Sequence, residues 1–267
     1  LWTEETPLTS LCSGTLIADQ WVLTAAHCLD EHEATYVGFG SLMEAMELIV
    51  RADAQYMHPE FEQVGSFSMD IGLVHLEDFV LYEPAIVNRT AFSDDMIGEH
   101  LTFVGWGRYD YDESLDGHKR VGEIALNAYQ DHDFSFFNEG VMTCSGDSGG
   151  PAFYDFGAGP TIAGITSFGD ISGGSFGVAT RVDLLVDWIE EHTGELPTAH
   201  SGDDDDVGDD DDSAAGDDDT AAPDDDDDSV AEGDDAEGCS CTVARASGSG
   251  RFALLSLVLL VGWRRAP

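Results

Sequence analysis

The sequence predicts an all-β body that ends in one helix and is followed by an acidic extension. Between residues 1 and 197, short apolar or alternating segments rich in Val, Ile, Thr and Phe are separated by Gly, Asp and Asn clusters. Many short strands with such turn signals are typical of a β-sandwich or β-barrel. After residue 197 the composition changes to Asp, Ala, Gly and Ser. We therefore expect one folded domain, residues 1–197, with a C-terminal extension.

Four segments are the clearest strand candidates, and all of them precede the helix candidate. They are Leu16–Thr24, Ile71–Leu76, Leu101–Val104 and Thr161–Ser167. The helix candidate is Asp183–His192, in which four apolar residues share one helical face: Leu184, Leu185, Trp188 and Ile189. Asp183 is a suitable N-cap, and Gly194 and Pro197 are typical of the end of a helix. The domain boundary is placed just after this helix.

Charge sets limits on the partners. The 267 residues carry a formal net charge of −44, from 54 acidic and 10 basic residues. This excludes nucleic acid as a partner, because phosphate binding needs a basic patch. The first 197 residues alone hold 34 of the acidic and six of the basic residues. The domain is thus acidic even without its tail, which suits salty surroundings that screen self-repulsion.

The segment 198–238 is predicted to be a disordered spacer. Residues 203–238 contain eighteen Asp and two Glu and almost no large apolar residues. Such a chain cannot bury enough surface to offset its ordering entropy, and its like charges repel. The Asp runs lack the defined spacing and closing Glu of a calcium loop, so diffuse counterion binding is expected instead of a site.

The run Cys144-Ser145-Gly146-Asp147-Ser148-Gly149-Gly150-Pro151 is the main candidate for chemistry. Its glycines permit a tight turn that aims two backbone N–H groups at one point beside the Ser148 hydroxyl, as in an oxyanion hole. A serine needs a neighbouring base to become a nucleophile. The alternative is a glycine-rich turn with an incidental serine, so the choice depends on whether partners exist elsewhere.

Two further runs supply such partners. They are Thr24-Ala25-Ala26-His27-Cys28 and Asp70-Ile71-Gly72-Leu73-Val74-His75-Leu76. In this order, the three runs resemble the trypsin/chymotrypsin family of serine endopeptidases, and the likeness extends over about residues 10–193. Further segments that carry it are Cys12–Ile17, His58-Pro59, Gly105-Trp106-Gly107, Ser167-Phe168-Gly169 and Gly177–Val182. The resemblance implies two six-stranded antiparallel β-barrels with a C-terminal helix.

The resemblance also implies roles for individual residues. Ser148 is the expected nucleophile, His27 the general base and then acid, and Asp70 the buried group that orients the imidazole. Backbone N–H groups of Gly146 and Ser148 form the expected oxyanion hole, and Ser167 is expected to hydrogen-bond Asp70. Asp53 and Asp78 compete for the orienting role, but neither opens the strand that resembles the family's.

The expected substrate-binding residues are Met142, Ser167, Phe168, Gly169 and Gly177. In the family the residue six positions before the nucleophile lies at the floor of the primary pocket, and here it is Met142. Without a carboxylate there, cleavage after Arg or Lys is not supported. With glycines at two wall positions, we expect a preference for medium or large apolar side chains. The alternative is that Met142 turns away and another loop shapes the pocket.

The five cysteines divide into two groups. Cys12 and Cys28 match the pair that staples the loop beside the catalytic histidine, and this disulfide indicates an oxidising compartment. The family's usual partner of Cys144 would lie near Asp170–Ser175, where the sequence has no cysteine. We therefore expect Cys144 to be a free thiol, with intermolecular pairing as the alternative.

The N-terminal end departs from the family pattern. In the family, a newly freed N-terminus inserts and pairs with the aspartate before the nucleophile, here Asp147. No Ile/Val-Val-Gly-Gly-like start precedes Cys12. The expectation is that an upstream segment carries the signal peptide and activation site, and that the chain beginning at Leu1 forms the oxyanion hole poorly.

Residues 239–267 carry a separate signal. Cys239-Ser240-Cys241 is followed by the apolar run Phe252–Trp263 and by Arg264-Arg265. This run of twelve residues is shorter than the ~20 that span a bilayer as a helix. The pattern resembles the MYXO-CTERM sorting tag of myxobacterial surface proteins, with an ordinary tail anchor as the alternative. It implies envelope sorting machinery as a partner and the protease domain outside the cell, attached to the bacterial envelope.

The functional hypothesis is a secreted or surface-anchored serine endopeptidase that acts on protein or peptide substrates as a monomer. No cofactor is predicted, and the remaining histidines show no metal-ligand spacing such as His-Glu-x-x-His. The alternative is a catalytically silent relative used as a binding or adhesion module.

Overall fold

The computed structural model describes residues 11–30, 33–62, 68–108, 117–137, 140–169, 176–198 and 258–264. All of them belong to one compact unit, made of Leu1–Ala199 and Cys239–Pro267. The predicted spacer from residue 199 onward, together with Cys239 and Cys241, lies outside the described residues. No helix in the described ranges is long and apolar enough to cross a membrane.

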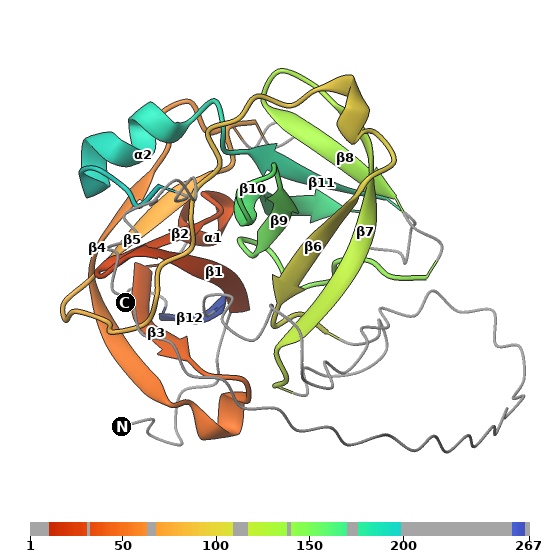
Figure 1. Ribbon diagram of the computed structural model, residues 1–267. Helices are drawn as coiled ribbons and strands as arrows, with labels where there is room; N and C mark the ends of the chain where they lie inside the picture. The colour runs from red at the N-terminus through yellow and green to blue at the C-terminus, as the bar shows by residue number, and fades with distance from the viewer. Residues whose placement is uncertain are drawn as a thin grey trace, which may run out of the picture. The chain divides into compact units, whose positions relative to one another are not determined.

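Two closed antiparallel six-stranded barrels make up the all-β fold (Figure 1). The strand order is β1-β12-β3-β4-β5-β2 in the first and β10-β11-β8-β7-β6-β9 in the second. The first barrel's strands are β1 (Leu11–Ala18), β2 (Trp21–Thr24), β3 (Glu33–Phe39), β4 (Leu48–Met57), β5 (Gly72–Leu76) and β12 (Val258–Arg264). The second barrel's strands are β6 (His100–Gly105), β7 (Arg120–Tyr129), β8 (Asp133–Phe137), β9 (Pro151–Asp155), β10 (Pro160–Gly169) and β11 (Phe176–Arg181). The helices are α1 (His27–Asp30), α2 (Val186–Thr193) and the 3-10 turns η1 (Met43–Ala45) and η2 (Asp94–Met96).

The four predicted strands are all present, with one subdivision. The segment Leu16–Thr24 is a hairpin instead of a single strand, because the chain turns between β1 and β2, and Ala18 pairs with Trp21. The other three coincide with β5, β6 and β10 to within two residues at each end. Alternating burial in β6 and continuous burial through most of β10 explain why the apolar pattern located them.

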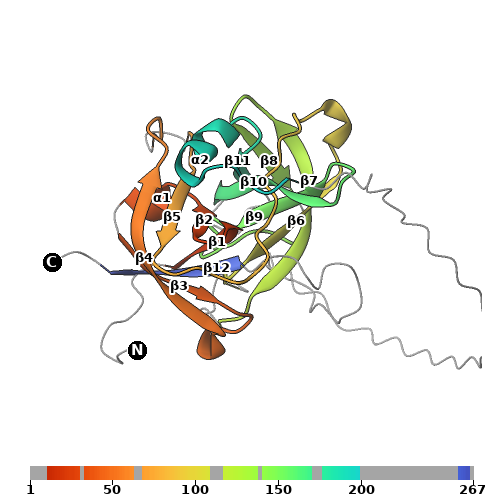
Figure 2. The same cartoon turned by 60° about the vertical axis from the view of Figure 1, so that its left-hand side comes forward.

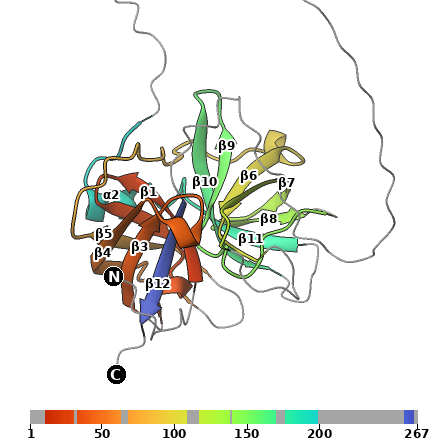
Figure 3. The same ribbon diagram turned by 90° about the horizontal axis from the view of Figure 1, so that it is seen from below.

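The sixth strand of the first barrel comes from the C-terminal apolar run. Val258–Arg264 pairs antiparallel with β1 on one side and β3 on the other, so it lies between them in the sheet (Figures 2 and 3). From the sequence, this run was expected only to be a sorting or anchoring segment. Pairing satisfies the backbone donors and acceptors that β1 and β3 would otherwise leave at open sheet edges.

The terminal helix begins later than predicted. Helix α2 starts at Val186, and Asp183 lies in a turn before it. Asp183 does not cap the helix because its carboxylate accepts hydrogen bonds from Arg181 Nε (3.0 Å) and Nη2 (2.6 Å). Leu184 is accordingly exposed instead of packed. The predicted end is confirmed, because Gly194 adopts φ = 79° and donates its N–H to the Glu190 carbonyl.

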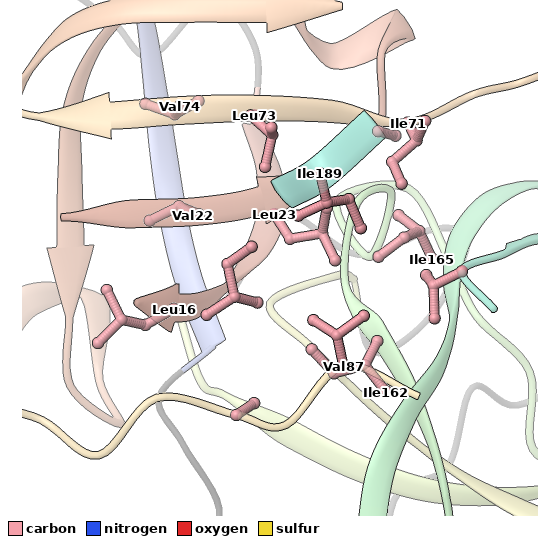
Figure 4. Close-up of a cluster of buried hydrophobic side chains, with 14 of the residues drawn as sticks. Leu16, Val22, Leu23, Ile71, Leu73, Val74, Val87, Ile162, Ile165 and Ile189 are labelled. Atoms are coloured by element: carbon pink, nitrogen blue, oxygen red, sulfur yellow. The ribbon is translucent and has the colours of Figure 1, made fainter. Parts of the chain in front are cut away.

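Each barrel has its own apolar core. The first core also includes residues from outside its barrel: Val87 from the connection between β5 and β6, Ile162 and Ile165 from β10, and Ile189 from α2 (Figure 4). The second is aromatic, with Phe103 and Phe136 ring centroids 4.4 Å apart. Burying a side chain of this size contributes about 1.5–3 kcal/mol. The first core thus joins the barrel to β10 and α2, which fixes the segments on which the candidate site depends.

Candidate active site

His27 is the first residue of α1, directly after β2 and the buried Ala25 and Ala26. Its backbone N–H donates to Asp70 Oδ1 at 2.8 Å, and its ring Nδ1 lies 2.7 Å from Asp70 Oδ2. An ionised carboxylate only accepts, so Nδ1 carries the proton and Nε2 is left as the basic nitrogen of the neutral ring. The two contacts fix both the position and the tautomer of the imidazole.

Asp70 is fully buried at the start of β5. Besides His27, its Oδ2 accepts a hydrogen bond from Ser167 Oγ on β10, as the sequence predicts. A buried carboxylate needs such donors to offset its desolvation. The preceding Met69 has φ = 51°, a left-handed conformation that is costly for a residue with a side chain. Sequence analysis missed this strained position, which turns the chain so that Asp70 points at His27.

The predicted disulfide Cys12–Cys28 is confirmed, with a Cα–Cα distance of 6.3 Å. It ties β1 to α1 immediately beside the site. Cys28 Sγ lies 3.7 Å from His27 Nε2 and 3.7 Å from the Ser148 carbonyl oxygen. The side chain of the candidate base and the backbone of the candidate nucleophile therefore both lie next to this sulfur atom. Cys12, His27 and Cys28 are close enough together to suggest a metal site. The two sulfurs are oxidised to a disulfide, however, and do not offer the thiolates that bind metals.

The glycines around Ser148 serve close contacts between the two barrels. Gly146 and Gly149 have φ of 105° and 82°, which favour glycine. A Cβ on Gly149 would overlap Thr24 Oγ1 and the Ser13 carbonyl oxygen. Ser13 N donates to the Ser148 carbonyl at 2.8 Å. The tight turn expected from the sequence is therefore present, and it packs directly on β1 and β2.

The Asp147 carboxylate is enclosed by the loop before it and by the end of β6. Its Oδ1 accepts from Gly107 N at 2.7 Å, and its Oδ2 accepts from Cys144 N at 2.8 Å. A Cβ on Gly105 or Gly107 would overlap its oxygens. Burial raises the pKa of Asp147 to about 6, although the two N–H donors and the positive charge of Arg120 act in the opposite direction. Asp147 is therefore a partly buried acid with a raised pKa of about 6.

The expected oxyanion donors stand next to this aspartate. In the part of the chain that the structure describes, the N–H groups of Gly146 and Ser148 donate to no protein acceptor, and Gly146 is buried. No hydrogen bond joins Ser148 Oγ to His27 among these residues. Such bonds are often long without substrate and tighten in the substrate complex, so this does not argue against the pair.

Of the expected substrate-binding residues, Met142 lines a pocket of about 20 Å³, room for roughly one water molecule, together with Asp147 and Arg120. Gly169 and Gly177 do not line it. A Cβ on Gly177 would overlap the Phe136 ring, so that space is filled, and a Cβ on Gly169 would meet the Phe176 carbonyl oxygen at 3.0 Å. Ser167 faces Asp70, as described above.

Phe168 lies on β10 next to Ser167 and is half-buried. It pairs with Val178 of β11 across an irregularity in the register. The region 170–175, which follows this strand, is outside the described residues. The substrate-binding assignments therefore stay predictions.

Two alternatives from the sequence can now be decided. Asp53, a competitor of Asp70, is paired with another histidine, since its Oδ1 lies 2.6 Å from His75 Nδ1. The expectation that Cys144 is a free thiol is wrong, because Cys144 is disulfide-bonded in the structure. That expectation came from the family's usual pairing near 170–175, and sequence spacing does not limit which cysteines meet in three dimensions.

Two antiparallel barrels, with a histidine–aspartate pair from one and a serine in a glycine turn from the other, define the class of trypsin-like serine proteases. The trypsin family model matches residues 2–189. Brachyurin of Leptuca pugilator is 34% identical over 209 residues, which cover 70% of this chain and 89% of that protein. Serine protease 1 of Drosophila melanogaster is 29% identical over 213 residues, covering 68% and 76%.

Longer relatives match a similar share of this chain. The complement C1s subcomponent of Sus scrofa is 30% identical over 224 residues, covering 67% of this chain and 31% of that protein. The chain also spans less than half of vitamin K-dependent protein C of Rattus norvegicus, 46% of whose length is covered. The chain belongs to the trypsin family, and it is a serine endopeptidase.

Proposed function

We propose that Ser148, His27 and Asp70 are the catalytic triad of this endopeptidase. The observation that carries the proposal is the buried Asp70 carboxylate, which accepts from His27 at Nδ1 and at the backbone and so makes Nε2 the unprotonated nitrogen of the neutral ring. Ser148 Oγ attacks the substrate carbonyl carbon as Nε2 takes its proton, and the tetrahedral oxyanion is bound by the N–H groups of Gly146 and Ser148. Nε2 returns the proton to the leaving amine, and water then hydrolyses the acyl-enzyme.

Active-site labelling tests this assignment. A fluorophosphonate probe should label the full-length, correctly processed protein, and Ser148→Ala should abolish labelling. Removing a triad serine or histidine lowers kcat by roughly 10⁶-fold in a related mechanism, so His27→Ala should label far more slowly than the native protein. Unchanged labelling of Ser148→Ala would place the nucleophile elsewhere. No labelling of the native protein would favour the alternative of a catalytically silent binding module.

We further propose protein or peptide substrates with a medium or large apolar side chain before the scissile bond. The support is the sequence position of Met142, which carries no charge to pair with Arg or Lys. A panel of chromogenic peptides that differ only at this side chain tests the proposal. Fastest cleavage after Arg or Lys would contradict it.

For location, we propose secretion followed by attachment to the cell envelope through residues 239–267. The support is the order of the Cys239-Ser240-Cys241 motif, the apolar run and the terminal arginines. Because Val258–Arg264 pairs with β1 and β3, attachment through this segment requires its release from the first barrel.

Cell fractionation tests the location. The full chain is compared with a chain ending at residue 238, and the thermal stability of both purified proteins separates mislocation from misfolding. We expect the full chain in the envelope fraction and the shortened chain in the medium. Equal release of both would contradict attachment through this segment.

A further inference from the structure

We propose that Ser13 is a positioning residue for the oxyanion hole, through a side-chain hydroxyl that holds the Gly146 carbonyl. This inference rests on the proposed catalytic role of the Gly146–Ser148 loop. Ser13 lies on β1 and is completely buried. Its Oγ donates to the Gly146 carbonyl oxygen at 2.9 Å and accepts from the Trp106 N–H at 3.0 Å. The hydroxyl thus connects the first barrel, the nucleophile loop and the end of β6.

Every polar group of Ser13 is used at this junction. Its backbone N–H donates to the Ser148 carbonyl at 2.8 Å, and its carbonyl accepts from Thr24 Oγ1 at 2.8 Å. Ser13 therefore contacts the two residues whose N–H groups are the expected oxyanion donors, Gly146 through the side chain and Ser148 through the backbone. A buried polar group with all partners satisfied specifies one local arrangement, because any other leaves groups unpaired.

The Gly146 carbonyl is the part of the loop that most needs such a contact. Gly146 has φ = 105° and no Cβ, so steric contacts with a side chain do not fix the orientation of its peptide groups. The Gly146 carbonyl belongs to the peptide between the two donors. Rotation of that peptide would turn Gly146 N–H and Ser148 N–H relative to each other. A misplacement of 1 Å at such a site can cost roughly 100-fold in rate.

The next residue of the loop, Asp147, is held from the same place by a different contact. Trp106 N–H donates to Ser13 Oγ, and the following N–H, of Gly107, donates to Asp147 Oδ1. Two consecutive N–H groups after β6 therefore support the loop. The first acts on the Gly146 carbonyl through Ser13, and the second holds the Asp147 side chain directly. The loop is thus held at two points: at the Asp147 side chain and, through Ser13, at the Gly146 carbonyl.

The test compares Ser13→Ala with a matched control. Ser13→Ala keeps the backbone bond to Ser148 and removes only the hydroxyl. Thr161→Ala removes a hydroxyl that donates to the Tyr154 carbonyl at 3.3 Å, in the hairpin of β9 and β10 away from the nucleophile. The full-length protein is used, with the chromogenic peptide that it cleaves fastest. Melting temperature, kcat, KM and the inhibition constant of a peptide aldehyde, whose adduct places an oxyanion in the hole, are measured.

We expect Ser13→Ala to lower kcat by roughly 10- to 100-fold, with KM changed less than about threefold, because the loss affects transition-state binding. Aldehyde inhibition should weaken by a similar factor. Thr161→Ala should lower the melting temperature and leave kcat within about twofold. If Ser13→Ala is folded and keeps its kcat, or if only its KM rises, the proposal is wrong. An inactive native protein would instead contradict the proposed function.

Ser13→Gly covers the case in which the alanine variant does not fold. Glycine leaves room for a water that pairs with both Gly146 and Trp106 but holds the carbonyl less rigidly. Its kcat should fall by less than that of the alanine variant, with KM preserved. Full kcat in Ser13→Gly would mean that the hydroxyl only satisfies buried polar groups, and would overturn the positioning role.

Discussion

The enclosed carboxylate of Asp147 should make the folding stability depend on pH with a defined sign. Burial raises its pKa from 3.8 to about 6 against the two N–H donors and Arg120. A carboxyl whose folded pKa lies above its unfolded pKa binds protons more tightly in the folded state. Its contribution is therefore fully present below about pH 4 and is lost as the pH rises through about 6.

The size of the effect follows from the shift. A shift of about two units, at 1.36 kcal/mol per unit, corresponds to roughly 3 kcal/mol between pH 4 and pH 7. Asp147→Asn removes the titration while keeping the shape of the side chain. Its amide N–H₂ faces one of the two backbone donors, at Gly107 or Cys144, which adds a cost that does not depend on pH. The slope of the difference, not its absolute value, reports the carboxyl group.

The measurement is the free energy of unfolding in urea for the native protein and Asp147→Asn, at half-unit steps from pH 3.5 to 8. The native protein should lose about 3 kcal/mol relative to the variant across this window. Asp78→Asn, at an exposed position, controls for the general effect of removing one negative charge. If the native protein instead gains stability relative to Asp147→Asn as the pH rises, the N–H donors and Arg120 outweigh burial and the reasoning fails.

Two further predictions concern stability away from the nucleophile. Arg181→Met leaves the buried Asp183 carboxylate without its ion pair, and the free energy of unfolding in urea should fall by about 3–5 kcal/mol. Arg89→Met removes a pair whose arginine is 40% exposed, so the same free energy should fall by only about 0–1 kcal/mol. Equal losses would contradict the difference in burial. Replacing Cys12 and Cys28 together by alanine removes a link between residues 16 apart and should cost about 3 kcal/mol, measured in the same way. A loss below about 1 kcal/mol would show that the unfolded chain is compact without the link.

The sequence predicted the parts of the site that depend on local pattern. His27 follows a strand and Asp70 opens one, so their runs were recognisable, and the bond from Ser167 to Asp70 followed from the resemblance. The Cys12–Cys28 link was predicted from the same source. These features concern short segments in which the residue type and its neighbours along the chain carry the information.

The features that were not predicted depend on contacts between distant segments. Asp183 is a good N-cap by type, but Arg181 takes its carboxylate. Val258–Arg264 has the composition of an anchor, yet it pairs between β1 and β3. In each case a tertiary partner overrides the local preference, and no spacing rule in the chain identifies that partner.

Because the site depends on contacts between distant segments, it should be more sensitive than the fold to changes at the contact between the barrels. The nucleophile turn is held directly by Ser13 from the first barrel and by Gly107 and Thr166 from the second. Thr24 and Trp106 in turn hydrogen-bond Ser13. These contacts join segments up to about 135 residues apart in the chain. The first apolar core also packs between the barrels, because it includes Ile162 and Ile165 of β10. A shift of one barrel against the other that is too small to separate this shared core still changes several loop contacts at once. Activity should consequently be lost before the free energy of unfolding when the contact between the barrels is weakened.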